Sequence, residues 1–112
     1  MLIDTHSHCY WDMIYPRVHE VIDSMRGYAV THAIQIGCDM DSSQQAIDLA
    51  RGYPDVFRAT VGIHPNECDK YDISYIENMI KNIDRMIQEN RDYVVGIGET
   101  GLDFHYLPDD SL

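Results

Sequence analysis

The sequence predicts an α/β fold with about four βα units. Three observations lead to it: four short apolar runs have the length of strands, three segments between them have helical periodicity, and most candidate functional residues follow the apolar runs. Strands that alternate with helices are typical of parallel sheets. A doubly wound open sheet and a (β/α)₈ barrel both begin in this way and both carry function at the carboxyl ends of strands. The pattern alone leaves these two architectures open.

Four apolar runs predict the strands. They extend from Met1 to Thr5, Ala33 to Cys38, Phe57 to Ile63, and Tyr93 to Glu99. Short, largely apolar runs are expected for parallel strands that helices cover. Polar residues lie at or just past the carboxyl ends of these runs, and they are His6, His8, Cys38, Asp39, His64 and Glu99. We expect them to gather at one end of the sheet.

Two helical segments lie between the first three runs. One begins at Pro16, an early helix position that proline favours, and ends at Gly27; its apolar face consists of Val18, Val21, Ile22 and Met25. The other begins at Ser42 or Ser43, ends at Gly52, and buries Ala46, Ile47 and Ala50. Both are expected to cover the sheet.

The third helical segment has the clearest pattern. Ser74 and Glu77 have the spacing of a capping box at its start. Isoleucines recur at helical intervals over about four turns, and they are Ile76, Ile80, Ile83 and Ile87. This apolar face predicts a helix that packs against the sheet.

Charge restricts how the chain could contact a nucleic acid. The 112 residues, a length suited to one domain (1–112), carry 19 acidic and 8 basic side chains, which gives a net charge of −11. A negative net charge is the wrong sign for a protein that binds nucleic acid through a general basic surface. Bound divalent ions are one way to supply the counter-charge that a phosphate substrate needs.

The cysteines and the N-terminus indicate a compartment. Cys9, Cys38 and Cys68 are an odd, widely spaced set without a CxxC pair, which argues against a disulfide framework and favours reducing conditions. The first residues lack the basic start and apolar run of a signal peptide, and no segment has the length of a membrane span. We expect a cytoplasmic protein with no membrane contact.

The first predicted strand carries a candidate metal site. Asp4, His6 and His8 alternate along it, so their side chains are expected to project to the same side. Two imidazoles placed in this way can bind one metal ion, and the residue types admit several transition metals. The alternative is that two histidines at this spacing are core or capping residues.

Glu99 is the second candidate ligand and the candidate catalytic residue. It ends the fourth run, where we expect it to share a face with Val95 and Ile97. A buried carboxylate without a partner costs several kcal/mol, and a metal ion is a natural partner. Its two oxygens could also bridge a pair of ions. The alternative is a salt bridge to Arg58 or Lys81.

Two further residues are candidates for substrate binding. His64 follows the third run, and Gly62 before it removes a side chain where backbone or ligand must come close. His64 could donate a hydrogen bond to a phosphate oxygen, or it could be a structural loop residue. Asp103 could orient a ligand or bind substrate, or it could be a solvated loop acid.

The motifs DTHSH, VGIHP and GIGETGLDFH occur in this order along the chain. In order and approximate spacing they are similar to those of the TatD family of metal-dependent hydrolases. The family frequently has HxHLD at its start, whereas here His8 is followed by Cys9, Tyr10, Trp11 and Asp12. That aromatic pair could stack on a base or simply pack.

The resemblance implies a fold and an activity. The fold is the N-terminal half of a (β/α)₈ barrel of the metal-dependent hydrolase type, in which His6 and His8 bind one metal and Glu99 bridges to a second. The cofactors are two divalent ions, Mg²⁺, Mn²⁺ or Zn²⁺. The activity is phosphodiester hydrolysis of DNA from the 3′ end. The family's remaining ligands, two histidines and an aspartate on later strands, have no counterpart in these 112 residues, so we expect little activity from the chain alone.

Two other functions stay open. An amidohydrolase-like enzyme acting on amide or ester bonds would use the same pair of histidines. A non-catalytic half-barrel would expose two sheet edges and an apolar face, which favours self-association or a need for the C-terminal half.

Overall fold

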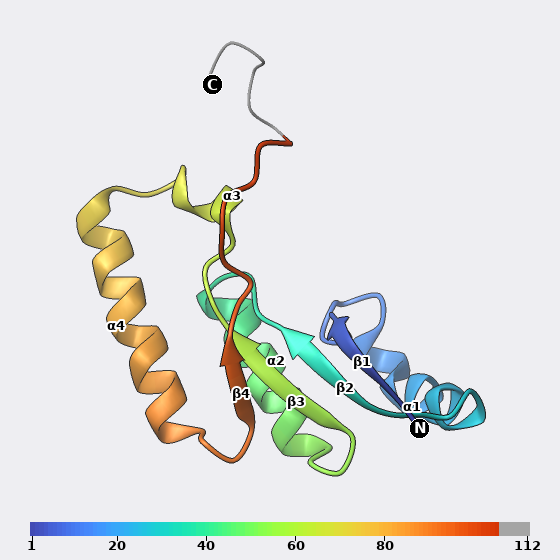
Figure 1. The fold of residues 1–112 in the computed structure, drawn as a ribbon. Helices are drawn as coiled ribbons and strands as arrows, with labels where there is room; N and C mark the ends of the chain where they lie inside the picture. The colour runs from blue at the N-terminus through green and yellow to red at the C-terminus, as the bar shows by residue number, and fades with distance from the viewer. Residues whose placement is uncertain (106–112) are drawn as a thin grey trace.

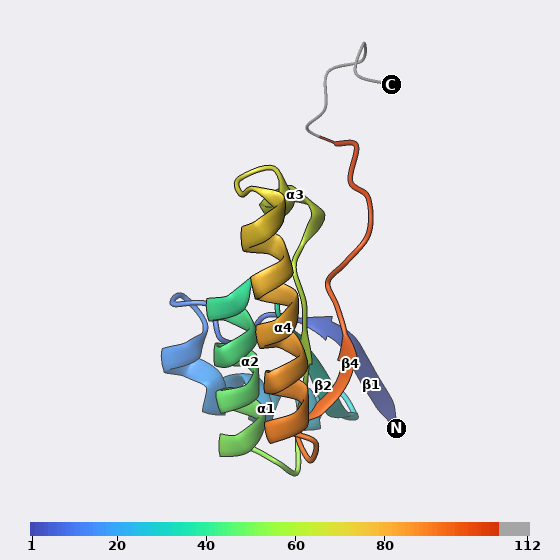
Figure 2. The same ribbon diagram turned by 90° about the vertical axis from the view of Figure 1, so that its left-hand side faces the viewer.

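The computed structural model describes residues 1–105 and shows a parallel sheet with helices on one side (Figures 1 and 2). The elements in chain order are β1 (Leu2–Ser7), the 3₁₀ turn η1 (Tyr15–Arg17), α1 (Val18–Gly27), β2 (Val30–Ile36), α2 (Met40–Gly52), β3 (Phe57–Val61), α3 (Pro65–Cys68), α4 (Ile73–Glu89) and β4 (Val94–Ile97). The predicted alternation of strands and helices is confirmed.

The order of the strands separates the two architectures that the sequence left open. The four strands lie in the order β1-β2-β3-β4, and each pairs in parallel with its neighbours. In Figure 2, α1, α2 and α4 all lie on the same side of this sheet. A doubly wound sheet reverses its strand order and has helices on both faces. Consecutive order with helices on one face is the arrangement of a (β/α)₈ barrel.

The core fills the space between the sheet and its helices. Phe57, Ala59 and Val61 of β3 are fully buried, and so are Ile47 and Ala50 of α2. Alternate residues of a strand point to the same face, so β3 presents these three side chains to the helices. The small alanines allow α2 to approach the sheet closely. This layer fixes the position of the strand ends where the candidate residues lie.

The helix starts differ from their predictions. Pro16 lies in the 3₁₀ turn Tyr15–Arg17, and α1 begins at Val18 rather than at Pro16. The second helix begins at Met40, because Asp39 is its N-cap and forms a capping box with Ser42: Ser42 N donates to Asp39 Oδ1 (2.7 Å) and Asp39 N donates to Ser42 Oγ (2.9 Å). The predicted start at Ser42 or Ser43 is therefore wrong. In α4 the cap is Asp72, whose Oδ1 accepts from Tyr75 N (2.8 Å), and not Ser74. Aspartate caps a helix as well as serine does, and both sites offer several candidates.

The strand bounds also differ from the predicted ones. β2 begins at Val30, ahead of the apolar run, because Val30 and His32 already pair with Leu2 and Ile3 of β1. β4 ends at Ile97, so the prediction that the strand reaches Glu99 is wrong. After Ile97 the chain leaves the ladder: Gly98 N still donates to Val61 O (2.9 Å), but Glu99 N donates to Gly37 O (2.8 Å), beyond the end of β2. The chain therefore crosses over the end of β3.

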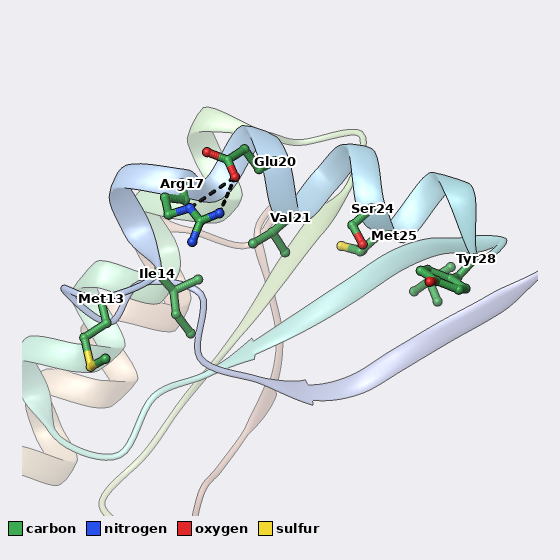
Figure 3. A pocket seen from close by; sticks show the side chains of 9 residues that line it. Met13, Ile14, Arg17, Glu20, Val21, Ser24, Met25 and Tyr28 are labelled. Atoms are coloured by element: carbon green, nitrogen blue, oxygen red, sulfur yellow. Dashed lines mark hydrogen bonds and ion pairs between the residues drawn. The ribbon is translucent and has the colours of Figure 1, made fainter.

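Apolar surface stays open at both edges of the sheet. A groove beside β4 is lined mainly by isoleucines of α4 together with Ile97. Figure 3 shows a second groove along α1, into which Ile14, Val21 and Met25 project, with Tyr28 at one end. Among the described residues, no helix combines the length and apolar character that a membrane span needs.

Candidate metal centre

His6 and His8 meet at the carboxyl end of β1. Their ring centroids are 5.1 Å apart and the rings are nearly perpendicular, at 74°. Asp4, which alternates with them, does not join them, because its Oδ1 accepts a hydrogen bond from the backbone N–H of His6 (2.9 Å). The prediction that the two histidine side chains project to the same side of the strand is confirmed. The hydrogen bond that holds Asp4 could not be predicted from the sequence.

The orientation of His8 is fixed by its neighbours. Its Nδ1 lies 3.0 Å from the carbonyl oxygen of Ile36, which can only accept, so Nδ1 carries the proton and Nε2 is left as a ligand atom. The hydroxyl of the buried Tyr10 donates to the same oxygen (2.6 Å). Burial lowers the pKa of His8, partly offset by the bond to Ile36. A lowered pKa favours the neutral imidazole, which is the form that binds metal.

Glu99 follows β4, at the opposite edge of the sheet from β1, and its side chain reaches the histidines across the strand ends. Its Oε2 lies 3.8 Å from His6 Nε2, and its Oε1 lies 3.5 Å from His64 Nε2. The side chain is about one-third exposed, at 33%. The alternative partner Arg58 donates instead to the carbonyls of Pro54 and Phe57, before and at the start of β3. Within residues 1–105, the ion pairs of Glu99 are with histidines.

The expectation that Val95, Ile97 and Glu99 share a face is wrong. Ile97 lines the groove beside α4, whereas the Glu99 carboxylate faces His6. The register between β3 and β4 is irregular after Ala59, and the ladder ends at Ile97, so simple alternation does not extend to Glu99. The crossing of Gly98 and Glu99 over Gly62 brings the carboxylate inward instead.

Gly62 is what permits this crossing. A Cβ atom on Gly62 would lie 2.5 Å from the carbonyl carbon of Gly98 and 2.9 Å from the nitrogen of Glu99. Side chains larger than hydrogen therefore cannot be accommodated without moving the backbone that carries Glu99. The close approach expected at Gly62 is therefore made by the backbone of Gly98 and Glu99, directly after β4.

His64 lies beside Glu99 with a defined proton position. It is the N-cap of the short helix α3: its Nδ1 accepts from Asn66 N (3.1 Å), and its own backbone N–H donates to Cys38 O (2.7 Å). Since Nδ1 accepts, the proton of the neutral ring is on Nε2, the atom that faces Glu99. His64 is thus both a structural loop residue and a donor pointing at the cluster.

Asp103 is linked to His64 through Asn66. Its Oδ1 accepts from His105 N (2.9 Å), and its Oδ2 accepts from Asn66 Nδ2 (3.2 Å). The bond to His105 is the main cause that lowers the pKa of this carboxyl. Asp103 thus ties the segment after β4 to α3, which lie side by side in Figures 1 and 2.

Two residues beside the cluster had been given no definite role. Cys38 Sγ lies 3.7 Å from Glu99 Oε2, and burial raises the pKa of this thiol. The ring of Trp11 is stacked on that of His8, with centroids 4.9 Å apart and planes within 4°. The position of Cys38 at a strand end was its signal in the sequence. Trp11 was expected to stack on a base or to pack, but nothing in the sequence indicated that its partner would be His8.

The donor set fits a divalent cation. Among the described residues, His6, His8 and Glu99 form a group in which one ligand atom from each lies within 4.8 Å of the others. Ligands on one ion, with bonds of about 2.1 Å, lie roughly 3 to 4 Å apart, so small side-chain rotations would close the site. Two imidazoles and a carboxylate suit Zn²⁺ or Mn²⁺. The remaining oxygen of Glu99 faces His64 and could bind a second ion.

Comparisons with known proteins agree with this chemistry. The family model described as "TatD related DNase" matches residues 3–111. An "Uncharacterized metal-dependent hydrolase MG009" of Mycoplasma genitalium is 33% identical over 102 residues, which cover 89% of this chain and 37% of the relative. A "3'-5' ssDNA/RNA exonuclease TatD" of Pectobacterium carotovorum is 34% identical over 86 residues, which cover 77% of this chain and 31% of the relative.

Solved structures share the fold. The TatD homologue YJJV of Escherichia coli superimposes with a TM-score of 0.80 at 22% identity, over 97% of this chain and 39% of that one. A hydrolase described as a TatD family protein from Entamoeba histolytica gives 0.79 at 19% identity, over 98% and 41%. The chain spans less than half the length of these relatives.

Proposed function

The chain belongs to the TatD-related DNase family, and on that premise we propose that it supplies the first part of a metal centre for phosphodiester hydrolysis of DNA. Its fold is the N-terminal half of a (β/α)₈ barrel of the metal-dependent hydrolase type. Residues 1–112 would then be a partial hydrolase domain, and a complete protein would remove nucleotides from the 3′ end of a strand. The observation that carries the proposal is the convergence of His6, His8 and Glu99.

Each residue has a defined part in this proposal. His6 and His8 would hold one ion, and the two oxygens of Glu99 would serve that ion and a second, with Mg²⁺, Mn²⁺ or Zn²⁺ as candidates. When bound, such ions supply Lewis acidity toward the phosphodiester and lower the pKa of a water. His64 donates its Nε2 proton to a phosphate oxygen, and Asp103 positions the loop through Asn66.

The acidity of the chain agrees with a substrate held through metal. With a net charge of −11, the protein surface repels a polyanion at long range. Phosphate contact therefore depends on local positive charge, which the ions would provide, together with the hydrogen-bond donor at His64 Nε2. We also propose a cytoplasmic setting, where Cys9, Cys38 and Cys68 stay reduced.

A nuclease assay tests the proposal. With Mn²⁺ and single-stranded DNA labelled at its 5′ end, a complete barrel that contains this chain should shorten the DNA from its 3′ end. Replacing both His6 and His8 with alanine should lower the rate by about 100-fold or more, because the ion loses two ligands. The 112-residue chain alone should show little activity.

The second candidate is an amidohydrolase-like enzyme, because paired imidazoles serve amide or ester hydrolysis equally well. Small amides and esters should therefore be assayed beside DNA. Turnover of an amide by the complete barrel, with no change in the DNA, would contradict the nuclease proposal and support this candidate.

The open edges lead to a further expectation, that the isolated chain self-associates or needs a C-terminal complement. Within residues 1–105, β1 and β4 each pair on one side only, and apolar grooves lie beside β4 and along α1. In sedimentation, oligomers should grow with concentration. Ile80→Lys in the groove beside β4 should reduce them, whereas Ile73→Lys, at an exposed position of the same helix, should not. A compact monomer at all concentrations would rule this out.

A further inference from the structure

Trp11 has an unusual position for a large aromatic side chain. One face of its ring is covered by the parallel ring of His8, at 4.9 Å and 4°, yet the residue is 54% exposed. An indole is large and mostly apolar, so leaving half of it in water forgoes much of its hydrophobic stabilisation. This exposed aromatic surface adjoins a side chain of the candidate metal centre.

The loop that carries Trp11 is held in place at both ends. Trp11 N donates to His8 O (3.2 Å), and Trp11 O accepts from Ile14 N (2.7 Å) and Tyr15 N (2.8 Å). The two preceding residues, Cys9 and Tyr10, are buried and act as anchors. Since the backbone and one ring face are fixed, the open part of the ring is presented in a set orientation rather than by a loose loop.

We propose that the open part of Trp11 is a stacking platform for an unpaired nucleobase of a single strand whose phosphate lies at the metal centre, an inference that rests on the proposed function. Stacking suits this acidic chain, because it needs no positive charge and accepts any base. The base must be unpaired, because within a duplex the faces of a base are covered by its neighbours.

A purely structural role for Trp11 makes a different prediction. If the ring only orients His8, removing it would weaken metal binding and with it the binding of any phosphate chain, whether or not that chain carries bases. If the ring stacks on a base, the loss appears only when the base is present. Comparing a normal strand with one that lacks its 3′-terminal base separates the two roles.

The experiment uses a complete barrel that contains this chain, in Mg²⁺, with two short oligothymidylates. One is normal and one is abasic at its 3′ end, and both have phosphorothioate links that resist hydrolysis. Binding is measured by the anisotropy of a 5′ label. The wild-type chain should prefer the normal strand by about tenfold, and Trp11→Ala should remove that preference, while Trp11→Phe should retain most of it. Tyr28→Ala is the control, because Tyr28 is an exposed aromatic at the opposite ends of the strands.

Trp11 also provides an independent signal, its own fluorescence, which is the difference in emission between the wild type and Trp11→Phe. Its fluorescence should be quenched by the normal strand and much less by the abasic one. Equal affinity of the wild type for both strands, or a preference that survives in Trp11→Ala, would overturn the inference while leaving the proposed function intact. Failure of the wild type to bind either strand would count against the proposed function itself, and the inference would fall with it.

Discussion

Replacing Glu99 with glutamine should lower the affinity of the chain for Zn²⁺ by about 100-fold or more. Glutamine has nearly the same shape, so packing is retained, but it removes the negative charge that faces His6 and His64. The ion would then have two neutral imidazoles as its protein ligands. Calorimetric titration with Zn²⁺ gives the affinity directly.

The control for this variant is Glu77→Gln. Glu77 lies on α4 and is exposed, so its replacement should leave the Zn²⁺ affinity within about twofold. Thermal unfolding without metal should be nearly the same for Glu99→Gln and the unaltered chain, because a partly exposed carboxylate beside histidines contributes little. Unchanged Zn²⁺ affinity in Glu99→Gln would remove Glu99 from the centre.

Replacing Gly62 with alanine should damage both stability and metal binding. The added methyl group would meet the backbone of Gly98 and Glu99 at 2.5 to 2.9 Å, so the crossing segment must move. We expect the free energy of unfolding to fall by about 1 to 3 kcal/mol. We also expect the Zn²⁺ affinity to fall by about tenfold or more, because the carboxylate moves with its backbone.

Gly27→Ala and Gly52→Ala are matched controls, because a Cβ atom at either position would meet nothing within 4 Å. Both lie at the ends of helices, where alanine should be neutral or slightly stabilising. Denaturant unfolding gives the stabilities of all three variants. If Gly62→Ala matched the controls in stability and in Zn²⁺ affinity, the crossing would not be what places Glu99.

Much of the fold could be predicted from local patterns. The isoleucines of α4 repeat at helical spacing, and Met79 and Ile83 of that helix are buried in the core. The histidines could be brought together in the same way, because His6 and His8 lie on one short stretch of chain whose periodicity decides where they point.

The placement of Glu99 could not be predicted in that way. Its approach to His6 depends on three things that lie far apart in the sequence: the end of the ladder at Ile97, the bond from Glu99 N to Gly37 O, and the space above Gly62. Strand periodicity was used to place Glu99 near the histidines, and it does lie there. The periodicity itself does not hold, however, since Ile97 and Glu99 do not share a face. Cys38 was predicted to lie at this end of the sheet, and Trp11 to stack on a base or pack. Their contacts with Glu99 and His8 could not be predicted, because only tertiary structure brings these side chains together.

The most direct test of this account is a crystal structure of the chain grown with Zn²⁺, with the ion located from its anomalous scattering. The account predicts a peak about 2.0 to 2.2 Å from His6 Nε2, His8 Nε2 and one carboxylate oxygen of Glu99. An ion bound elsewhere, or one held by the histidines with Glu99 turned away from it, would contradict the account.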